Sequence, residues 1–303
     1  MNINRIDLAT LSLFSKVAKT GSITRGAHAA GLAVGAASKR IADLEATLGV
    51  ALLERHSRGI HITPAGRTLE DHARRILADV SQMVSELADH AAGHAGAIRI
   101  WANTSAATQY LPEVVARFLA ANPGTRIELE HSTSGAAIIA LLQGEADVAV
   151  FVSRTPPAGI QSCVFRADQL VLAAPRGHPL AARRSVDFSE VLDYDFICLP
   201  PSTSLAIRLR EEAEAQERRV PVRFCVKSYD AMCRLVGAGL GVAVLPSAAL
   251  QTQLAQLPLV QVGLNDPWTA RDLLLGVRDF GALPPIARSF VASLCPQGVF
   301  VPR

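Results

Sequence analysis

A stripe of apolar residues in the first third of the chain constrains its fold most strongly. Its members follow one another at alternating intervals of four and three residues: Leu69, Ala73, Ile76, Val80, Met83 and Leu87. This spacing is the seam of a two-stranded coiled coil. Thr63 can cap a helix that begins at Pro64, because the missing N–H of proline would have had no partner there. We predict a linker and dimerisation helix over residues 64–92; the alternative is that the stripe packs on the C-terminal part of the same chain.

The length and composition predict a multidomain chain without a membrane span. A chain of 303 residues is long enough for two or three compact units. No apolar run reaches the roughly 18 residues that a span needs, and the first residues lack the pattern of an export signal. We expect a soluble, cytoplasmic protein with no membrane partner.

The five cysteines are scattered, with no Cys-x-x-Cys pair and no zinc-ligand spacing. We expect buried thiols and no metal. The sequence also lacks a glycine-rich phosphate loop, a Gly-x-Ser-x-Gly motif and paired carboxylates, so neither an enzyme nor a cofactor is expected.

Positive charge is concentrated at the N-terminus. Residues 1–62 contain eight Lys and Arg against four Asp and Glu, whereas the whole chain has a net charge of only +3. Segregated basic charge is typical of a domain with a polyanion partner. The N-terminal fifth is therefore the candidate for a contact with nucleic acid.

The basic segment has the pattern of a helix-turn-helix. Helical spacing predicts a first helix over residues 5–20, ended by Gly21, and Ser22 is placed to cap a second helix over residues 23–30. Small residues in that second helix would let another helix approach closely. A turn at residues 31–33 leads to a third helix over residues 35–48, which presents basic and hydroxyl groups away from its apolar face.

Residues 52–62 then predict a short hairpin, or wing, with basic groups at its tip. Side chains of the third helix would enter the major groove of double-stranded DNA, and the wing would reach phosphates or the minor groove. The predicted DNA-binding residues are Ser22, Thr24, Arg25, Ser38, Lys39, Arg40, Arg55 and Arg58. The alternative is an alanine-rich three-helix bundle with a solvated basic face.

From residue 97 onward, strands and helices alternate in a parallel βαβ pattern. A second lobe begins near Gln169, and the chain returns to the first lobe near Pro267. We therefore predict an α/β fold class: an N-terminal all-α winged helix-turn-helix over residues 1–63, the linker helix, and a two-lobed α/β domain over residues 93–303. Lobe 1 takes residues 93–168 and 266–303, and lobe 2 takes residues 169–265.

An ordered set of motifs resembles the DNA-binding domain of LysR-type transcriptional regulators. The segments are Leu11-x-x-Phe14, Gly21-Ser22-Ile23-Thr24-x-x-Ala27, Ala37-Ser38-x-x-Ile41-x-x-Leu44-Glu45-x-x-Leu48-Gly49, Leu52-Leu53-Glu54-Arg55 and Ile62-Thr63-Pro64-Ala65-Gly66. Residues 144–149 and 235–246 resemble the effector domain of that family, which is similar to type II periplasmic binding proteins. The chain departs from the family at Val34-Gly35, where Gln and Pro are frequent, and at Leu53, where Phe is frequent.

The resemblance implies a ligand-responsive transcription regulator. Its implied partners are an inverted-repeat DNA site, a small-molecule effector, a second copy of the chain through the linker helix, a homotetramer built from such dimers, and RNA polymerase. Two alternatives stay open: a thiol redox sensor that uses Cys225 and Cys233, and a solute-binding protein.

Four loops rich in hydroxyl groups mark the expected effector site. In open α/β sheets, ligands bind beyond the carboxyl ends of the strands, where helix N-termini favour an anion. With the resemblance, this predicts effector-binding residues in one interlobe cleft: Asn103, Thr104, Ser105, Thr133, Ser134, Ser202, Thr203, Ser204, Tyr229 and Asp230. Simple helix capping is the alternative role of each. A small organic acid is the expected effector, although the charge of Asp230 would oppose it.

Overall fold

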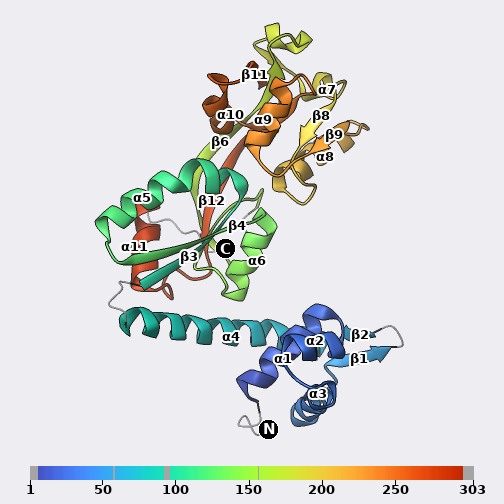
Figure 1. The fold of residues 1–303 in the computed structure, drawn as a ribbon, viewed down its shortest axis with the longest axis vertical. Helices are drawn as coiled ribbons and strands as arrows, with labels where there is room; N and C mark the ends of the chain where they lie inside the picture. The colour runs from blue at the N-terminus through green and yellow to red at the C-terminus, as the bar shows by residue number, and fades with distance from the viewer. Residues whose placement is uncertain (1–5, 57–58, 92–95, 156, 296–303) are drawn as a thin grey trace. The chain divides into compact units, whose positions relative to one another are not determined.

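The computed structural model describes residues 6–56, 59–91, 96–155 and 157–295 (Figure 1). The chain forms two compact units that divide between Ala92 and Gly93. Among the described residues, no helix is both long enough and apolar enough to cross a membrane.

The N-terminal unit is a winged helix-turn-helix followed by a long helix. Its elements are α1 (Leu8–Thr20), α2 (Ile23–Ala29), α3 (Val34–Leu48), β1 (Leu53–His56), β2 (Gly59–Ile62) and α4 (Pro64–Ala91). The strands β1 and β2 pair antiparallel, which confirms the predicted wing. The helix α1 begins later than predicted, because the Asp7 side chain caps it by accepting a hydrogen bond from the Thr10 amide at 2.7 Å.

Two glycines allow the close packing of this unit. A Cβ atom on Gly26 of α2 would lie 2.4 Å from the Val17 side chain of α1, so only glycine permits this helix contact. A Cβ atom on Gly66 of α4 would lie 2.2 Å from the Leu52 carbonyl oxygen. The prediction that small residues in the second helix allow a close approach is confirmed at Gly26, and Gly66 holds the start of α4 against the strand segment.

Lobe 1 of the C-terminal unit is a sheet covered by helices. Its strands lie in the order β4 (Thr125–His131), β3 (Gly96–Ala102), β5 (Val148–Val152), β12 (Ala270–Val277) and β6 (Gln161–Pro175). The strand β3 pairs parallel with β4 and β5, as predicted, whereas β12 is antiparallel to β5 and β6. The helices of this lobe are the π-helix η2 (Ala106–Tyr110), α5 (Leu111–Ala121), α6 (Ser134–Gln143) and α11 (Pro285–Leu294).

The strand β6 continues from lobe 1 into lobe 2, and the chain returns to lobe 1 through β12 (Figure 1). The strand β6 pairs with β12 as far as Gln169, and from Leu170 onward it pairs with strands of lobe 2. A separate hydrophobic core identifies each lobe. The elements of lobe 2 are η3 (Pro179–Ala182), β7 (Ser185–Val186), α7 (Phe188–Val191), β8 (Phe196–Cys198), α8 (Ser204–Glu214), β9 (Val222–Cys225), α9 (Tyr229–Gly237), β10 (Ala243–Pro246), α10 (Ser247–Leu254), β11 (Leu259–Leu264) and η4 (Pro267–Thr269).

The cysteines correct the expectation of five buried thiols. Cys163 on β6 and Cys295 at the end of α11 form a disulfide across 132 residues of sequence. Cys225 is exposed, and only Cys198 and Cys233 are buried thiols. Burial raises the pKa of Cys198 to about 12 and that of Cys233 to about 11. Sequence spacing could not reveal the disulfide, because only the packing of α11 on the sheet brings its two cysteines together.

Candidate DNA-binding and effector sites

The helix α3 presents a buried apolar face and an exposed basic face. Ala37, Ile41 and Leu44 are buried in the core of the N-terminal unit. Lys39 and Arg40 are exposed, and Ser38 is half-buried. Arg40 has a weak partner, since its Nη1 atom lies 3.7 Å from Oδ1 of the exposed Asp7. The two cations are therefore accessible to a polyanion.

The helix α2 gives its predicted residues different positions. The Ser22 hydroxyl caps α2 by accepting a hydrogen bond from the Arg25 amide at 3.3 Å. Thr24 and Arg25 are exposed, and the Arg25 guanidinium donates to the Thr20 carbonyl at 2.5 Å. In the wing, the Arg55 backbone lies on β1 opposite Ile60. The Arg55 side chain and all of Arg58 lie outside the described part of the structure.

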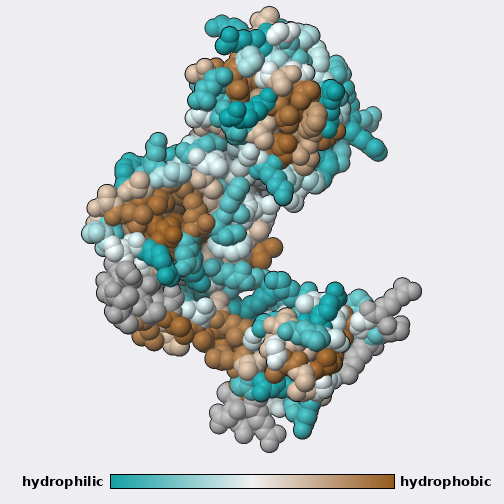
Figure 2. All heavy atoms as spheres, in the orientation of Figure 1, coloured by the Kyte–Doolittle hydropathy of each residue, from teal (hydrophilic) through white to brown (hydrophobic). Residues whose placement is uncertain are grey.

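The apolar stripe of α4 divides into two halves. Leu69 and Ala73 pack in the core of the N-terminal unit, and Ala73 is fully buried. The spacing of the stripe alone does not distinguish this packing on the chain's own domain from pairing with a second helix. Beyond it, Ile76, Met83 and Leu87 are 43%, 51% and 61% exposed. Figure 2 shows apolar side chains gathered along this helix.

A small cavity between the lobes brings most of the predicted effector residues together. It has a volume of about 10 Å³, and Asn103, Thr104, Ser105, Thr133, Ser134, Thr203, Ser204 and Tyr229 are among its lining residues. Ser202 lines a larger neighbouring cleft instead. Asp230 lines neither cavity: it is exposed, and its carboxylate accepts a hydrogen bond from Arg234 at 2.9 Å.

Hydrogen bonds between hydroxyl groups join the two lobes at this small cavity. The Ser105 and Tyr229 oxygens are 3.1 Å apart, and the Ser134 hydroxyl donates to the Ser204 oxygen at 3.3 Å. The Ser134 oxygen also accepts from the Asn103 amide group at 3.3 Å. Burial raises the pKa of Tyr229, so its hydroxyl stays protonated. The cavity thus contains neutral, mutually oriented hydroxyl groups.

A buried ion pair that no sequence motif indicates lies behind the small cavity. Arg271 on β12 and Asp168 on β6 are register partners, and the Arg271 Nη2 atom lies 2.6 Å from the Asp168 carboxylate. The same nitrogen donates to the Ser105 oxygen at 2.9 Å, and the Tyr110 hydroxyl donates to Asp168 at 3.4 Å. Burial raises the pKa of Tyr110. The ion pair therefore connects the strands β6 and β12 to Ser105 in the wall of the small cavity.

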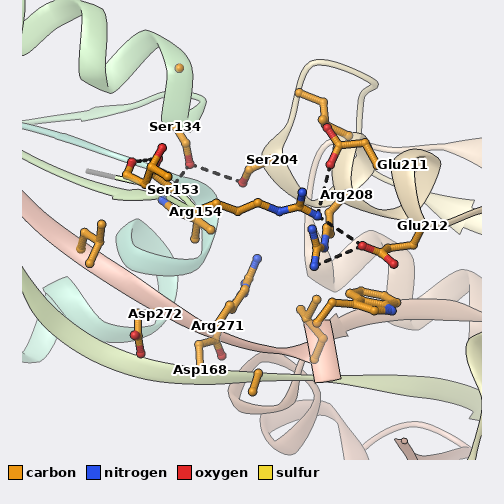
Figure 3. A pocket seen from close by; sticks show the side chains of 18 of the residues that line it. Ser134, Ser153, Arg154, Asp168, Ser204, Arg208, Glu211, Glu212, Arg271 and Asp272 are labelled. Atoms are coloured by element: carbon orange, nitrogen blue, oxygen red, sulfur yellow. Dashed lines mark hydrogen bonds and ion pairs between the residues drawn. The ribbon is translucent and has the colours of Figure 1, made fainter. Parts of the chain in front are cut away.

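The larger cleft has a volume of about 1370 Å³ and adjoins the small cavity at Ser134 and Ser204, which line both. Several charged side chains and one tryptophan line it: Arg154, Asp168, Arg208, Glu211, Glu212, Trp268, Arg271 and Asp272. Figure 3 shows Arg154 extending across the cleft toward Glu211 and Glu212. No local motif distinguishes these charged residues from ordinary surface charges in the sequence.

Two family models match this chain. The bacterial regulatory helix-turn-helix protein, lysR family, matches residues 8–67, and the LysR substrate binding domain matches residues 91–296. The chain belongs to the LysR family of transcriptional regulators. This confirms the resemblance and the predicted fold class.

A curated relative of this LysR regulator supports the same assignment, and two solved structures share its fold. The nitrogen assimilation regulatory protein nac of Klebsiella aerogenes is 30% identical over 292 residues, which cover 94% of this chain and 92% of nac. The crystal structure of full-length CbnR complexed with its target DNA has a TM-score of 0.63 at 20% identity, covering 97% of this chain and 100% of CbnR. The Synechocystis PCC6803 CcmR regulatory domain, in complex with 2-PG, has a TM-score of 0.61 at 19% identity, covering 66% and 96%.

The LysR assignment settles the general activity of the chain. It is a DNA-binding transcription regulator with an effector-binding domain, and its relatives are regulators rather than enzymes. Of the two cysteines in the redox alternative, Cys225 is exposed, whereas burial raises the pKa of Cys233 to about 11. Reactive thiols have a lowered pKa instead.

Proposed function

We propose that this LysR regulator binds an inverted-repeat site in double-stranded DNA and changes its occupancy of that site when a small organic acid binds in the small interlobe cavity. The main support for this proposal is that hydroxyl-bearing loops and Tyr229 converge at this cavity from both lobes. The small cavity has room for about one water molecule. Binding of an acid therefore requires the lobes to move, which couples the effector to the conformation of the protein.

Charge favours an acid as the effector. The helices α6, α8 and α9 begin at Ser134, Ser204 and Tyr229, all of which line the small cavity. Unsatisfied N–H groups and the helix dipole favour an anion at such positions. Since Asp230 is paired with Arg234 outside the cavity, it does not oppose an anion there.

The exposed half of the α4 stripe supports a dimer through the linker helix. Ile76, Met83 and Leu87 continue the seam beyond the part that the N-terminal unit covers. Pairing of two such helices would deliver two copies of α3 to successive half-sites. We extend the proposal to a tetramer of two such dimers, to a cytoplasmic location, and to RNA polymerase as the partner through which occupancy alters transcription.

Anisotropy measurements on the full-length protein test this function. The DNA is a labelled duplex from upstream of its own gene, and panels of monocarboxylates and dicarboxylates serve as effector probes. An effective acid should shift the binding curve of the wild type. Ser105→Ala should weaken that response about tenfold, because it removes the hydroxyl shared by Tyr229 and Arg271. DNA affinity without acid should be unchanged.

The matched control is Thr108→Ala, which removes an exposed hydroxyl whose one hydrogen bond among the described residues goes to the Thr104 carbonyl. An unchanged dose response of Ser105→Ala would remove that residue from the site. A protein that sediments as a monomer and ignores duplexes at low salt would contradict the proposed DNA-binding mode.

A further inference from the structure

Two arginines from opposite lobes share one carboxylate in the larger cleft. The Arg154 Nη2 atom, from the loop after β5, lies 3.3 Å from Oε1 of Glu212 on α8. The Arg208 Nη2 atom, from one turn earlier on α8, lies 3.1 Å from the same oxygen. Glu211 is a more distant partner of Arg154, at 3.6 Å. An acidic group thus already occupies a binding position between two guanidinium groups (Figure 3).

The Arg208 guanidinium has binding capacity that this carboxylate does not use. It lies over the Trp268 ring at 5.6 Å from the centroid. Its Nη1 atom is buried and has no hydrogen-bond partner among the described residues. A buried donor without a partner is costly, and guanidinium groups favour two-pronged contacts with carboxylates. The position is therefore suited to an acid that approaches with two oxygens.

The geometry connects this position to the small cavity. Ser134 and Ser204 line both spaces, so a ligand held at the hydroxyl groups can extend past them into the cleft. Apolar side chains line part of the route: Ile138, Val152, Ile207 and Leu274. Of the other acids there, Asp168 is paired with Arg271. Asp272 is exposed at the cleft surface.

We propose that the effector is a linear dicarboxylate with an apolar middle. This rests on the proposed function, because one carboxylate binds at the hydroxyl groups of the small cavity. The other replaces the Glu212 carboxylate between Arg154 and Arg208. Since these arginines belong to different lobes, the second carboxylate also holds the lobes together. A dicarboxylate should therefore shift the conformation more than a monocarboxylate.

Calorimetry on the full-length protein tests the inference with α,ω-dicarboxylates from succinate to suberate. Each diacid is compared with its half-amide, which keeps the length and removes one charge. The best diacid should bind at least about tenfold more tightly than its half-amide. Arg208→Gln and the exposed Arg154→Gln should each abolish that preference, while half-amide binding is retained. Glu212→Gln should raise diacid affinity several-fold, because it removes the internal competitor.

The control is Arg210→Gln, which removes an exposed arginine of α8 whose one ion-pair partner in the described part of the chain is Glu214. Equal binding of diacids and half-amides would overturn the inference and leave the proposed function standing. Weaker diacid binding by Glu212→Gln would also overturn it, because the cluster would then be only a structural link between lobes. If monocarboxylates, half-amides and diacids all fail to bind, both the inference and the organic-acid function fall.

Discussion

The N-terminal unit and the effector domain hold their charged groups in opposite ways. On α3, Lys39 is exposed and has no ion-pair partner among the described residues, and Arg40 has only a distant, exposed one. Behind the small cavity between the lobes, the Arg271 Nη2 atom lies 2.6 Å from the Asp168 carboxylate, and the Asp168 side chain is 1% exposed.

This difference corresponds to the two kinds of ligand. A protein that binds DNA gains affinity by replacing the counterions of the phosphates, so its cations need to be solvated and free. A small cavity gains affinity from groups that are already oriented before the ligand arrives. Removing a charge should therefore reduce binding in the N-terminal unit and stability in the effector domain.

The largest expected effect is that of Asp168→Asn. The substitution leaves Arg271 as a buried charge without its carboxylate, so the effector domain should lose about 3 kcal/mol or more of unfolding free energy. Urea denaturation followed by circular dichroism measures this loss. Asp272→Asn, at the neighbouring exposed position of β12, is the control and should change stability by less than about 0.5 kcal/mol. Equal stability of the two variants would contradict the idea that the buried charges of the effector domain serve its stability.

Lys39→Ala and Arg40→Ala test the role of the exposed charges in the N-terminal unit. Each should weaken specific binding to the operator duplex by roughly 10- to 100-fold, because it removes a groove contact worth about 1–3 kcal/mol, while the melting temperature stays near that of the wild type. Titrations at several salt concentrations separate loss of a phosphate contact from loss of a base contact. Arg117→Ala removes an exposed charge from α5 of the effector domain as a control. Retained specific affinity in both α3 variants would exclude α3 as the recognition helix.

The smallest effect is expected at Asp7, which caps α1 and contacts Arg40. Asp7→Ala should cost the N-terminal unit about 1 kcal/mol through loss of the cap, whereas Asp7→Asn keeps a capping oxygen and should cost less. The hydrogen bond from the Thr10 amide lowers the pKa of Asp7. The stability it contributes is therefore present above the unfolded-state pKa and is lost as the pH falls through the lower folded-state value. Acid titration of the melting temperature should show this loss in the wild type but not in Asp7→Ala.

Local signals made the N-terminal unit predictable. Ser22 and Thr63 act within the first turn of the helices that they cap. Such roles depend on neighbours in the sequence, so spacing alone indicates them. The π-helix η2 directly after Ser105 was not predicted, because no local residue preference distinguishes it from the start of α5.

In the effector domain, the sequence identified the hydroxyl-bearing loops because each lies where a strand feeds a helix. It could not show that Arg271 lies beside Asp168, that Arg154 reaches Glu212, or that Cys163 bonds Cys295.

The sequence by itself therefore determined the helix-turn-helix, the long helix with its apolar stripe and the hydroxyl-rich character of the loops between strands and helices. Only the tertiary structure decided which half of the seam is covered, which loop residues face the cavity and which charges are neutralised. The physical reason is that side-chain patterns and caps act over a few residues, whereas burial and pairing of charges depend on strands and helices that are far apart in the chain.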